Sequence, residues 1–381
     1  MSENTSAAGR AAPAVAALPA LDDAAPERVC AAVGARARSD VYGPQADPPA
    51  TAEPSATDAP TEAVLAAGFV TLLSDLGVIG VHGADARTFL HNQLTNDVEH
   101  LGAGEARWYG YCSPKGRLLA TAPGWADEDG VLLVVPRLQS EALRKRLAMF
   151  VLRAKAKVTN RSDTHVLLGV GGAAAAGALQ ALGLALPAPM RVERGAERSP
   201  AGGLAAIGMP TVEAAGQPCA RALLCVPAES LAAVWSALHG PLTPVPTPAW
   251  RWTEVRSGIP RLAAGAVEQF VPQMINFEVV EGVNFKKGCY PGQEIVARSQ
   301  YLGKLKRRMF AAHLDGPEPA PGSDVLGADG QPCGQVVLAA PAPRGGVDLL
   351  VESQVAAVQA GGLTAGGVAL EMGSLPYALP A

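Results

Sequence analysis

The feature that most constrains this chain is an abrupt change in composition near residue 62. Residues 1–62 are dominated by Ala, Pro, Ser, Thr and Asp, and Tyr42 is their only aromatic residue. Such a segment cannot bury enough apolar surface to offset the entropy lost on ordering. We therefore predict a disordered arm over residues 1–62, without a functional site, and expect the folded domains to be built from residues 63–381.

Composition and charge narrow the class of protein. The 381 residues are 49% hydrophobic and 17% charged, which is typical of soluble globular proteins with two or three domains. The net charge of −4 provides no global positive field toward nucleic acid or anionic lipid, so any basic site must be local. We expect no direct nucleic-acid partner and no membrane partner.

Cysteine usage and the absence of targeting signals suggest a location. The six cysteines form neither a CxxC pair nor a Cys/His cluster with zinc-ligand spacing, so we expect a reducing compartment and no metal site. The first residues lack the pattern of a secretory signal, and about 18 consecutive apolar residues occur nowhere. The prediction is a cytoplasmic protein.

Periodicity in the folded part indicates an α+β protein. Strand-like runs at residues 78–81, 108–112, 117–121 and 131–135 alternate with helical patterns that begin near Asp85, as a cap, and at 140–150. From Arg308 onward, short alternating runs separated by Pro, Gly and Asp predict a small antiparallel β-barrel. Gly169-x-Gly171-x-x-Ala174 formally matches a dinucleotide fingerprint, but without a series of βαβ units we interpret it as a strand-to-helix turn.

The most informative stretch is FKKGCYPGQEIVAR at residues 285–298. Tyr290-Pro291-Gly292-Gln293 fits a type II turn, with Pro at the second and Gly at the third position. We expect a helix to follow, with Gln293 and Glu294 in its first turn and Glu294 spaced to pair with Arg298.

Cys289 in this stretch has two interpretations. Lys286, Lys287 and a nearby helix start would favour its thiolate, which makes a nucleophile, a redox thiol or a transient metal ligand plausible. Alternatively, Cys289 is a small buried hydrophobic residue, the usual environment of a free cysteine. The other five cysteines lack such a setting, and we assign them no chemistry.

At this point the sequence resembles a known family. The stretch KKGCYPGQEIVAR is similar to the signature of YgfZ-type folate-binding proteins, within the superfamily of the glycine-cleavage T-protein. Four further stretches resemble motifs of the same family and occur in the expected order: FLHNQLTNDV at 89–98, CSPKGRLLA at 112–120, GIP at 258–260 and FVPQ at 270–273. The likeness covers about residues 65–315.

The resemblance implies a three-domain ring around a central channel that holds tetrahydrofolate. Two interleaved α+β domains would occupy residues 63–305, and the terminal β-barrel residues 306–381. The implied function is that of an accessory protein, rather than a turnover enzyme, for assembly or repair of iron–sulfur clusters. Its partners would be iron–sulfur assembly proteins and client iron–sulfur enzymes, including those that modify tRNA.

The resemblance also implies roles for individual residues. Cys289 would be the functional thiol, with motif neighbours at Lys287, Tyr290, Gln293, Glu294 and Arg298. The folate would be lined or supported by Asn96, Asp97, Lys115 and Arg117. Cations at residues 304–308 could contact folate carboxylates, or could simply form a solvated charged edge strand.

One departure from the superfamily bears on mechanism. The aminomethyltransferase hairpin ends in a carboxylate that acts on the folate nitrogen, whereas residues 115–120 here offer only cations and apolar side chains. General base chemistry at that spot is excluded unless another carboxylate reaches in. A folate-dependent aminomethyl or one-carbon transferase is therefore the alternative hypothesis, and an interaction scaffold with a vestigial folate site is a third.

Overall fold

The computed structural model describes residues 60–128, 130–196, 202–301 and 305–380. The predicted disordered arm lies outside the described residues except at its end, where helix α2 (Glu62–Ala67) already begins. Among the described residues, no helix is long and apolar enough to cross a membrane.

Two sheets form the larger part of the molecule. One has six strands in the order β11-β1-β7-β10-β9-β8, with the bounds Thr243–Pro244, Phe69–Leu72, His165–Gly171, Gln217–Pro227, Ala205–Ala214 and Val192–Arg194. The other has five strands in the order β3-β4-β5-β2-β6, with the bounds Ala106–Cys112, Leu118–Asp127, Gly130–Pro136, Leu76–His82 and Lys157–Asn160. Every pairing is antiparallel except the short parallel pair of β1 and β11.

The chain crosses between these sheets, so the two α+β units are interleaved as predicted. Strand β1 belongs to the six-stranded sheet, β2 starts only four residues later in the five-stranded sheet, and β7 returns to the first. A single hydrophobic core, which includes Trp125 of β4, Ile207 of β9 and Trp250, joins the facing sides of both sheets. The two units therefore share one interior.

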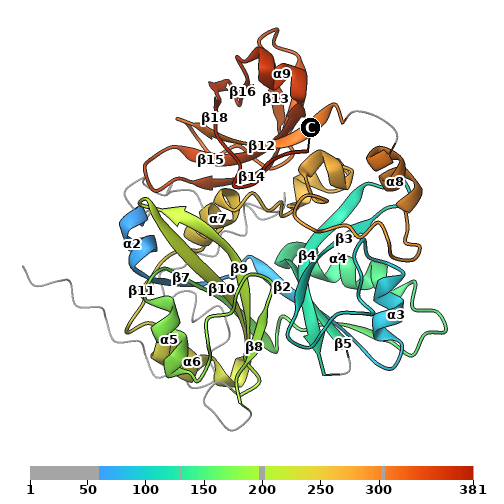
Figure 1. Cartoon of the computed structure of the whole chain (residues 1–381), viewed down its shortest axis with the longest axis vertical. Coiled ribbons are helices and arrows are strands. Elements are labelled where there is room, and N and C mark those ends of the chain that lie inside the picture. Colours follow the sequence, from blue (N-terminus) through green and yellow to red (C-terminus); the bar gives the residue numbers. More distant parts are fainter. Residues whose placement is uncertain (1–59, 129, 197–201, 302–304, 381) are drawn as a thin grey trace, which may run out of the picture.

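Helices cover the outer face of each sheet (Figure 1). Helices α5 (Ala175–Ala181) and α6 (Leu231–Leu238) pack on the six-stranded sheet through a second core that contains Leu179 and Trp235. Helices α3 (Ala86–His91) and α4 (Arg137–Ala148) pack on the five-stranded sheet through a third core. Apolar residues at helical spacing, such as Leu143 and Leu147, form these contacts.

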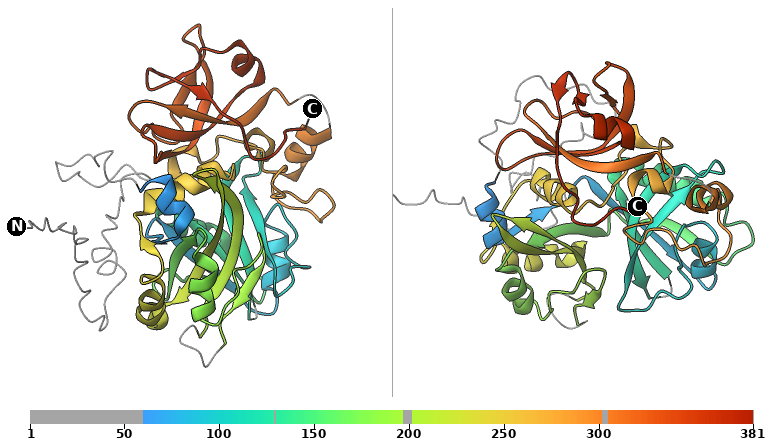
Figure 2. Two further views of the ribbon diagram at one scale, coloured as in Figure 1. Left: turned by 60° about the vertical axis from the view of Figure 1, so that its left-hand side comes forward. Right: turned by 45° about the horizontal axis from the view of Figure 1, so that its top comes forward.

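A barrel-like sheet of seven strands lies across one end of both units (Figures 1 and 2). Its strands are β12 (Arg307–Leu314), β13 (Asp324–Leu326), β14 (Pro332–Pro341), β15 (Val347–Gln354), β16 (Thr364–Ala365), β17 (Val368–Ala369) and β18 (Glu371–Met372), and the short helix α9 (Val355–Ala360) follows β15. All of its pairings are antiparallel. This confirms the predicted terminal barrel and the three-domain architecture.

Helix α7 (Thr247–Arg256) lies where the three units meet (Figure 1). It begins at Thr247, directly after Pro246, and has a second proline in its first turn. Trp252 on this helix donates its Nε1–H to Asp348 of β15 at 2.8 Å. The helix is therefore fixed to the barrel by a buried hydrogen bond.

Two local expectations have a clear outcome. Strand β7, which carries the Gly169–Gly171 pattern, has antiparallel neighbours on both sides, so it does not belong to a parallel βαβ dinucleotide unit. Asp85 stands at the start of α3, but its carboxylate accepts from the Lys155 N–H at 2.7 Å and not from the helix. Asp85 is therefore the N-cap residue, as predicted, but its side chain binds a neighbouring loop and makes no capping hydrogen bond.

Candidate functional site

The thiol segment, residues 286–290, ends in the predicted turn. The Gln293 N–H donates to the Tyr290 carbonyl at 3.2 Å, and Gly292 has a φ of +80°, as a type II turn requires. Helix α8 (Gln293–Tyr301) then begins at the predicted residue. Cys289 precedes the whole turn and does not lie at the helix N-terminus, so the helix start cannot account for its reactivity.

Exposure separates Cys289 from the other cysteines. Among the described residues, Cys289 is exposed and the other four cysteines are buried. The interpretation of Cys289 as a small buried hydrophobic residue is therefore wrong in this structure. The remaining cysteine, Cys30, lies outside the described residues.

Lys287, within the thiol segment, anchors this segment to the end of α3. Its ammonium donates to the carbonyls of His91 at 2.5 Å, Leu94 at 3.0 Å and Gly288 at 3.2 Å. It also stands 4.8 Å from the centre of the Tyr290 ring. Burial lowers the pKa of Lys287 to about 8, against the opposing influence of Asp97, Cys289 and Glu99.

The remaining motif neighbours of Cys289 have different environments. Tyr290 is buried, which raises the pKa of its phenol. Gln293 is half-buried, whereas Glu294 and Arg298 are exposed. No ion pair joins Glu294 to Arg298, although both lie in the described helix α8. The structure therefore places Lys287 over the Tyr290 ring and within electrostatic reach of Cys289, and leaves the predicted pair of α8 unformed.

The turn of the thiol segment packs against the hairpin turn between β3 and β4. A β-carbon on Gly292 would lie 2.4 Å from the Ser113 carbonyl oxygen and 2.6 Å from the Gly116 backbone, and Gly116 itself has a φ of +70°. Glycine is required at both positions because the two backbones touch. The structure thus brings together two motifs that lie far apart in the sequence.

Asn96 and Asp97 hold the chain that leads into the thiol segment. The Asn96 side chain donates to the carbonyls of Trp108 at 3.1 Å and Glu281 at 2.7 Å. Asp97 accepts from His91 at 3.1 Å and from His100 at 2.8 Å. Burial acts to raise the pKa of Asp97, but hydrogen bonds and charge from His100, and charge from His91, lower it overall.

Lys115 and Arg117 lie at the other end of β3 from Asn96 and Asp97. Both are exposed, and Arg117 donates to the carbonyl of Gln269. Strand β3, at about 3.3 Å per residue, separates the two pairs, so the structure does not gather the four predicted folate residues into one site. Of the nearby cations, Arg307 pairs with Glu352 at 2.5 Å and Arg308 pairs with Glu278. These two arginines are neutralised within the protein and do not form a solvated edge.

A narrow cavity, with a volume of about 20 Å³, lies between the facing sheets and α7. Its walls combine apolar side chains such as Trp108 and Met209 with three charged ones, Arg221, Glu254 and Arg261. Glu254 accepts from Arg261 at 2.7 Å. The sequence reasoning did not propose these residues, although an arginine within the apolar run of β10 was a signal, because a buried cation needs partners.

Arg221 carries an unsatisfied donor in this cavity. It is 1% exposed, donates through Nη1 to Thr253 at 2.6 Å and through Nε to the Pro210 carbonyl at 3.0 Å, and stands over the Trp250 ring. Within the described part of the chain, its Nη2 is buried and has no hydrogen-bond partner. Burial lowers the pKa of Arg221 to about 10, so it stays charged at neutral pH. A buried donor without a partner indicates a place for a ligand acceptor.

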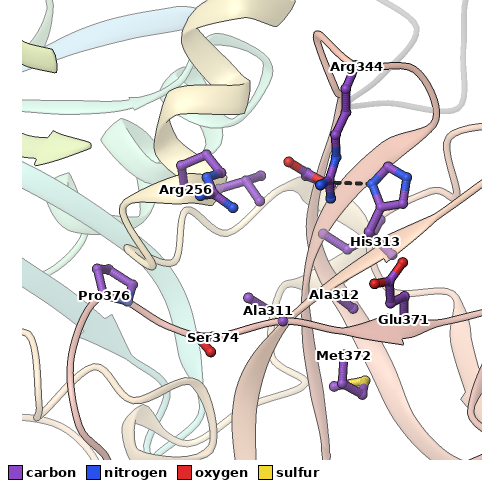
Figure 3. Close-up of a pocket in the computed structure, with 13 residues that line it drawn as sticks. Arg256, Ala311, Ala312, His313, Arg344, Glu371, Met372, Ser374 and Pro376 are labelled. Atoms are coloured by element: carbon purple, nitrogen blue, oxygen red, sulfur yellow. Dashed lines mark hydrogen bonds and ion pairs between the residues drawn. The ribbon is translucent and has the colours of Figure 1, made fainter. Parts of the chain in front are cut away.

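A second cavity, of about 460 Å³ including open space, separates α7 from the barrel (Figure 3). Arg256 and Arg344 extend into it from opposite sides. The carboxylate of Asp348 is already shared by Trp252, by His313 at 2.7 Å and by Arg344 at 3.6 Å. The buried Asp348 carboxylate already has partners within the protein. This cavity is therefore a weaker candidate for a ligand site than the one that contains Arg221.

Metal binding finds no support in the described residues, where no three His, Cys, Asp or Glu side chains are grouped to hold an ion. This observation covers only the ranges given above. It leaves the thiol segment and the two cavities as the candidate sites.

Comparison with known proteins places the chain beside bacterial relatives. It is 32% identical to the tRNA-modifying protein YgfZ of Edwardsiella ictaluri over 238 residues. The matched stretch covers 62% of this chain and 69% of that protein. It is 30% identical over 238 residues, with the same two shares, to the protein of that name from an Enterobacter species. The Cronobacter sakazakii protein of that name is 28% identical over 254 residues, 66% of this chain and 74% of the relative. No family model matches the chain.

A solved structure shares the architecture. The glycine cleavage system aminomethyltransferase T from Bartonella henselae superposes with a TM-score of 0.67, covering 83% of this chain and 88% of its own, at 18% identity. At this identity the likeness shows the fold alone. It agrees with two interleaved α+β units and a terminal barrel.

Proposed function

The chain belongs to the family of the tRNA-modifying protein YgfZ, and from this premise we propose that it binds tetrahydrofolate and supports the iron–sulfur enzymes that modify tRNA. The observation that carries the proposal is the placement of Cys289. This thiol is exposed, and the segment that holds it is docked on both α3 and the β3–β4 turn. Such a fixed, accessible thiol suits a protein that acts on partners through sulfur chemistry.

The polar side chains that line the cavity between the sheets match groups of a folate, and we propose that this narrow cavity widens to admit the pterin. Tetrahydrofolate supplies a reduced pterin that carries one-carbon units on its nitrogens. Arg221 Nη2, buried and without a partner in the described residues, would donate to an acceptor of the pterin. The Glu254 carboxylate would accept from its amino group, and Trp108 and Met209 would cover its flat face.

These residues also bear on the transferase alternative. Glu254 is a carboxylate that does reach the cavity, but it already accepts two hydrogen bonds from Arg261. Both hydrogen bonds reach the same oxygen, Oε2, and hold this carboxylate in place as a fixed acceptor. This arrangement favours binding of a folate over proton transfer to it, and therefore an accessory role over a transferase.

Folate binding is tested by equilibrium titration of tetrahydrofolate into the purified chain. We expect Arg221→Met to weaken binding by roughly 10- to 100-fold, the loss typical of a hydrogen bond to a buried charge. Arg256→Met alters the second cavity and should leave binding unchanged. The opposite ranking of the two variants would move the folate site to the barrel cavity.

The accessory role is tested in cells that lack this protein. We expect the activity of iron–sulfur enzymes, and the methylthiolation of tRNA, to fall and to recover when the wild-type chain is restored. Unchanged activities would overturn the accessory role. Formation of a one-carbon adduct of folate by the purified chain would then favour the aminomethyltransferase alternative.

A further inference from the structure

His91, the last residue of α3, lies against the thiol segment through both its backbone and its ring. Its carbonyl accepts the 2.5 Å hydrogen bond from Lys287. Its ring faces the next residue of the segment, because a β-carbon on Gly288 would lie 3.7 Å from His91 Nε2. Gly288 immediately precedes Cys289, so the imidazole lies beside the backbone that carries the thiol.

Asp97 fixes which nitrogen of His91 carries the proton. The Nδ1 atom of His91 lies 3.1 Å from a carboxylate oxygen of Asp97. Since the pKa of Asp97 is lowered, this carboxylate is charged at neutral pH. It therefore favours the tautomer protonated at Nδ1, in which Nε2 has a free lone pair.

The Nε2 atom is available for a proton. The His91 side chain is only 9% exposed, and within the described residues Nε2 has no hydrogen-bond partner. The partners of the ring lie at the other nitrogen. Nδ1 is 3.1 Å from Asp97, and the N–H groups of Val98 and Glu99, at 3.4 and 3.5 Å, are too distant to compete with the charged carboxylate for it. A buried imidazole with one nitrogen held by a carboxylate and the other free is arranged as a base next to a nucleophile.

We propose that His91 is the proton acceptor of Cys289 and that Asp97 is its positioning residue. The inference rests on the proposed role of Cys289 as an acting thiol. When the Cys289 side chain turns toward the ring, the proton passes from Sγ to Nε2, and a thiolate and an imidazolium remain. The imidazolium is stabilised by the Asp97 carboxylate, and the thiolate is stabilised by the Lys287 ammonium.

Charged groups from three parts of the chain surround His91. The loop after α3 contributes Asp97, Glu99 and His100, and β3 contributes Arg107, at 3.9 Å from Asp97. The thiol segment contributes Lys287 and Cys289. The His100 side chain offers a matched control, because its ring also binds Asp97, at 2.8 Å, but is 79% exposed and contacts the carboxylate oxygen that His91 does not.

The test is the rate at which iodoacetamide alkylates Cys289 in the full chain, followed by peptide mass spectrometry between pH 5.5 and 10. We expect His91→Gln, which can still donate to Asp97, to react at least about 10-fold more slowly than wild type near pH 7. The two rates should converge near pH 10, where hydroxide ionises the thiol without a base. His100→Gln should follow the wild-type profile.

Two outcomes would overturn the proposal. Coincident pH profiles of wild type and His91→Gln would show that the imidazole takes no proton. A rate lowered by the same factor at every pH would reduce His91 to a structural support. If His91→Gln does not fold, Asp97→Asn replaces it and should also slow alkylation near pH 7. Alkylation requires no folate, tRNA or partner enzyme, so a failure here is distinguishable from a failure of the proposed function.

Discussion

The side chain of Asn96 positions the backbone segments that form the site. Its buried amide links three backbone segments: it donates to Trp108 on β3 and to Glu281, and accepts from the Asp97 N–H at 2.8 Å. Next to it, Thr95 donates to the Gly282 carbonyl at 2.6 Å. These bonds place the chain from residue 281 onward, and thereby the thiol segment.

Replacing Asn96 should cost stability because it leaves buried carbonyls without donors. We expect Asn96→Ala to lower the free energy of unfolding by about 1 to 3 kcal/mol. Asn92→Ala, at an exposed position four residues earlier, should change it by less than about 0.5 kcal/mol. Urea denaturation of both variants measures the difference, and equal losses would contradict the linking role of Asn96.

At this scale the sequence predicts some residues well and others poorly. The stretch around Cys289 predicts the turn and the helix that follow the thiol, because Pro and Gly give a local pattern. Asn96 was assigned to the folate, whereas its amide is used by the backbone of a segment 185 residues away. Such a partner depends on the tertiary fold, and no local pattern carries that information.

At the scale of elements, two turns that touch through glycine position the thiol. Gly292 and Gly116 have positive φ values; a β-carbon on Gly292 would clash with the β3–β4 turn, and one on Gly116 would clash with Ile295 of α8. Gln273 then ties the FVPQ motif to α8 by donating to the Val296 carbonyl at 2.8 Å. The motifs that are separate in sequence are therefore one docked unit in the structure.

This docking can be measured with two alanine substitutions at glycines of similar conformation. Gly292→Ala and Gly216→Ala both place a β-carbon at a φ of about +70° to +80°, but only the one at Gly292 meets other atoms. Both should lose about 1 kcal/mol from backbone strain, and Gly292→Ala should lose at least about 1 kcal/mol more from overpacking. Thermal unfolding gives both values, and equal losses would show that the contact between the turns contributes little.

The elements themselves were largely predictable. The type II turn, the start of α8 and the hairpin follow from Pro, Gly and alternating apolar residues within a few positions. The i,i+4 pair of Glu294 and Arg298 was not formed, because exposed pairs gain little over hydration. The carboxylate of Asp85 accepts a hydrogen bond from a loop 70 residues later, and helix propensity alone does not predict this contact.

For the whole molecule, the shared interior makes stability sensitive to alkaline pH. Burial raises the pKa of the Cys112 thiol to about 12, and it also raises the pKa of Cys225 and of Tyr109. The unfolded chain releases these protons at lower pH than the folded one, so their stabilising contribution is complete below about pH 9 and is lost as the pH rises. Lys287, with its lowered pKa, acts in the opposite direction above pH 8, but it is a single group against several.

We therefore expect the free energy of unfolding to fall between about pH 9 and pH 11. Each such thiol lowers the free energy of unfolding by about 1.4 kcal/mol for every pH unit above its unfolded pKa, until the folded pKa is reached. Urea unfolding under reducing conditions should show a shallower dependence on pH in Cys112→Ala than in wild type, whatever the absolute stability of the variant. The same dependence in both would contradict the assignment of this effect to the buried thiol.

The architecture was predictable from the order of motifs, but the ligand cavity was not. Arg221 comes from the six-stranded sheet, and Glu254 and Arg261 come from α7 and the segment that follows it. The apolar walls come from both sheets. Only the crossing of the chain between β1 and β2 brings these residues together, and this crossing is a property of the whole fold.

The most direct measurement of the central claim is the level of tRNA methylthiolation in cells whose only copy of this protein is Cys289→Ala. The account predicts a level near that of cells lacking the protein, while the purified variant folds and binds tetrahydrofolate as tightly as wild type, because Cys289 lies outside the cavity that contains Arg221. Methylthiolation at the wild-type level in those cells would contradict the account and leave an interaction scaffold.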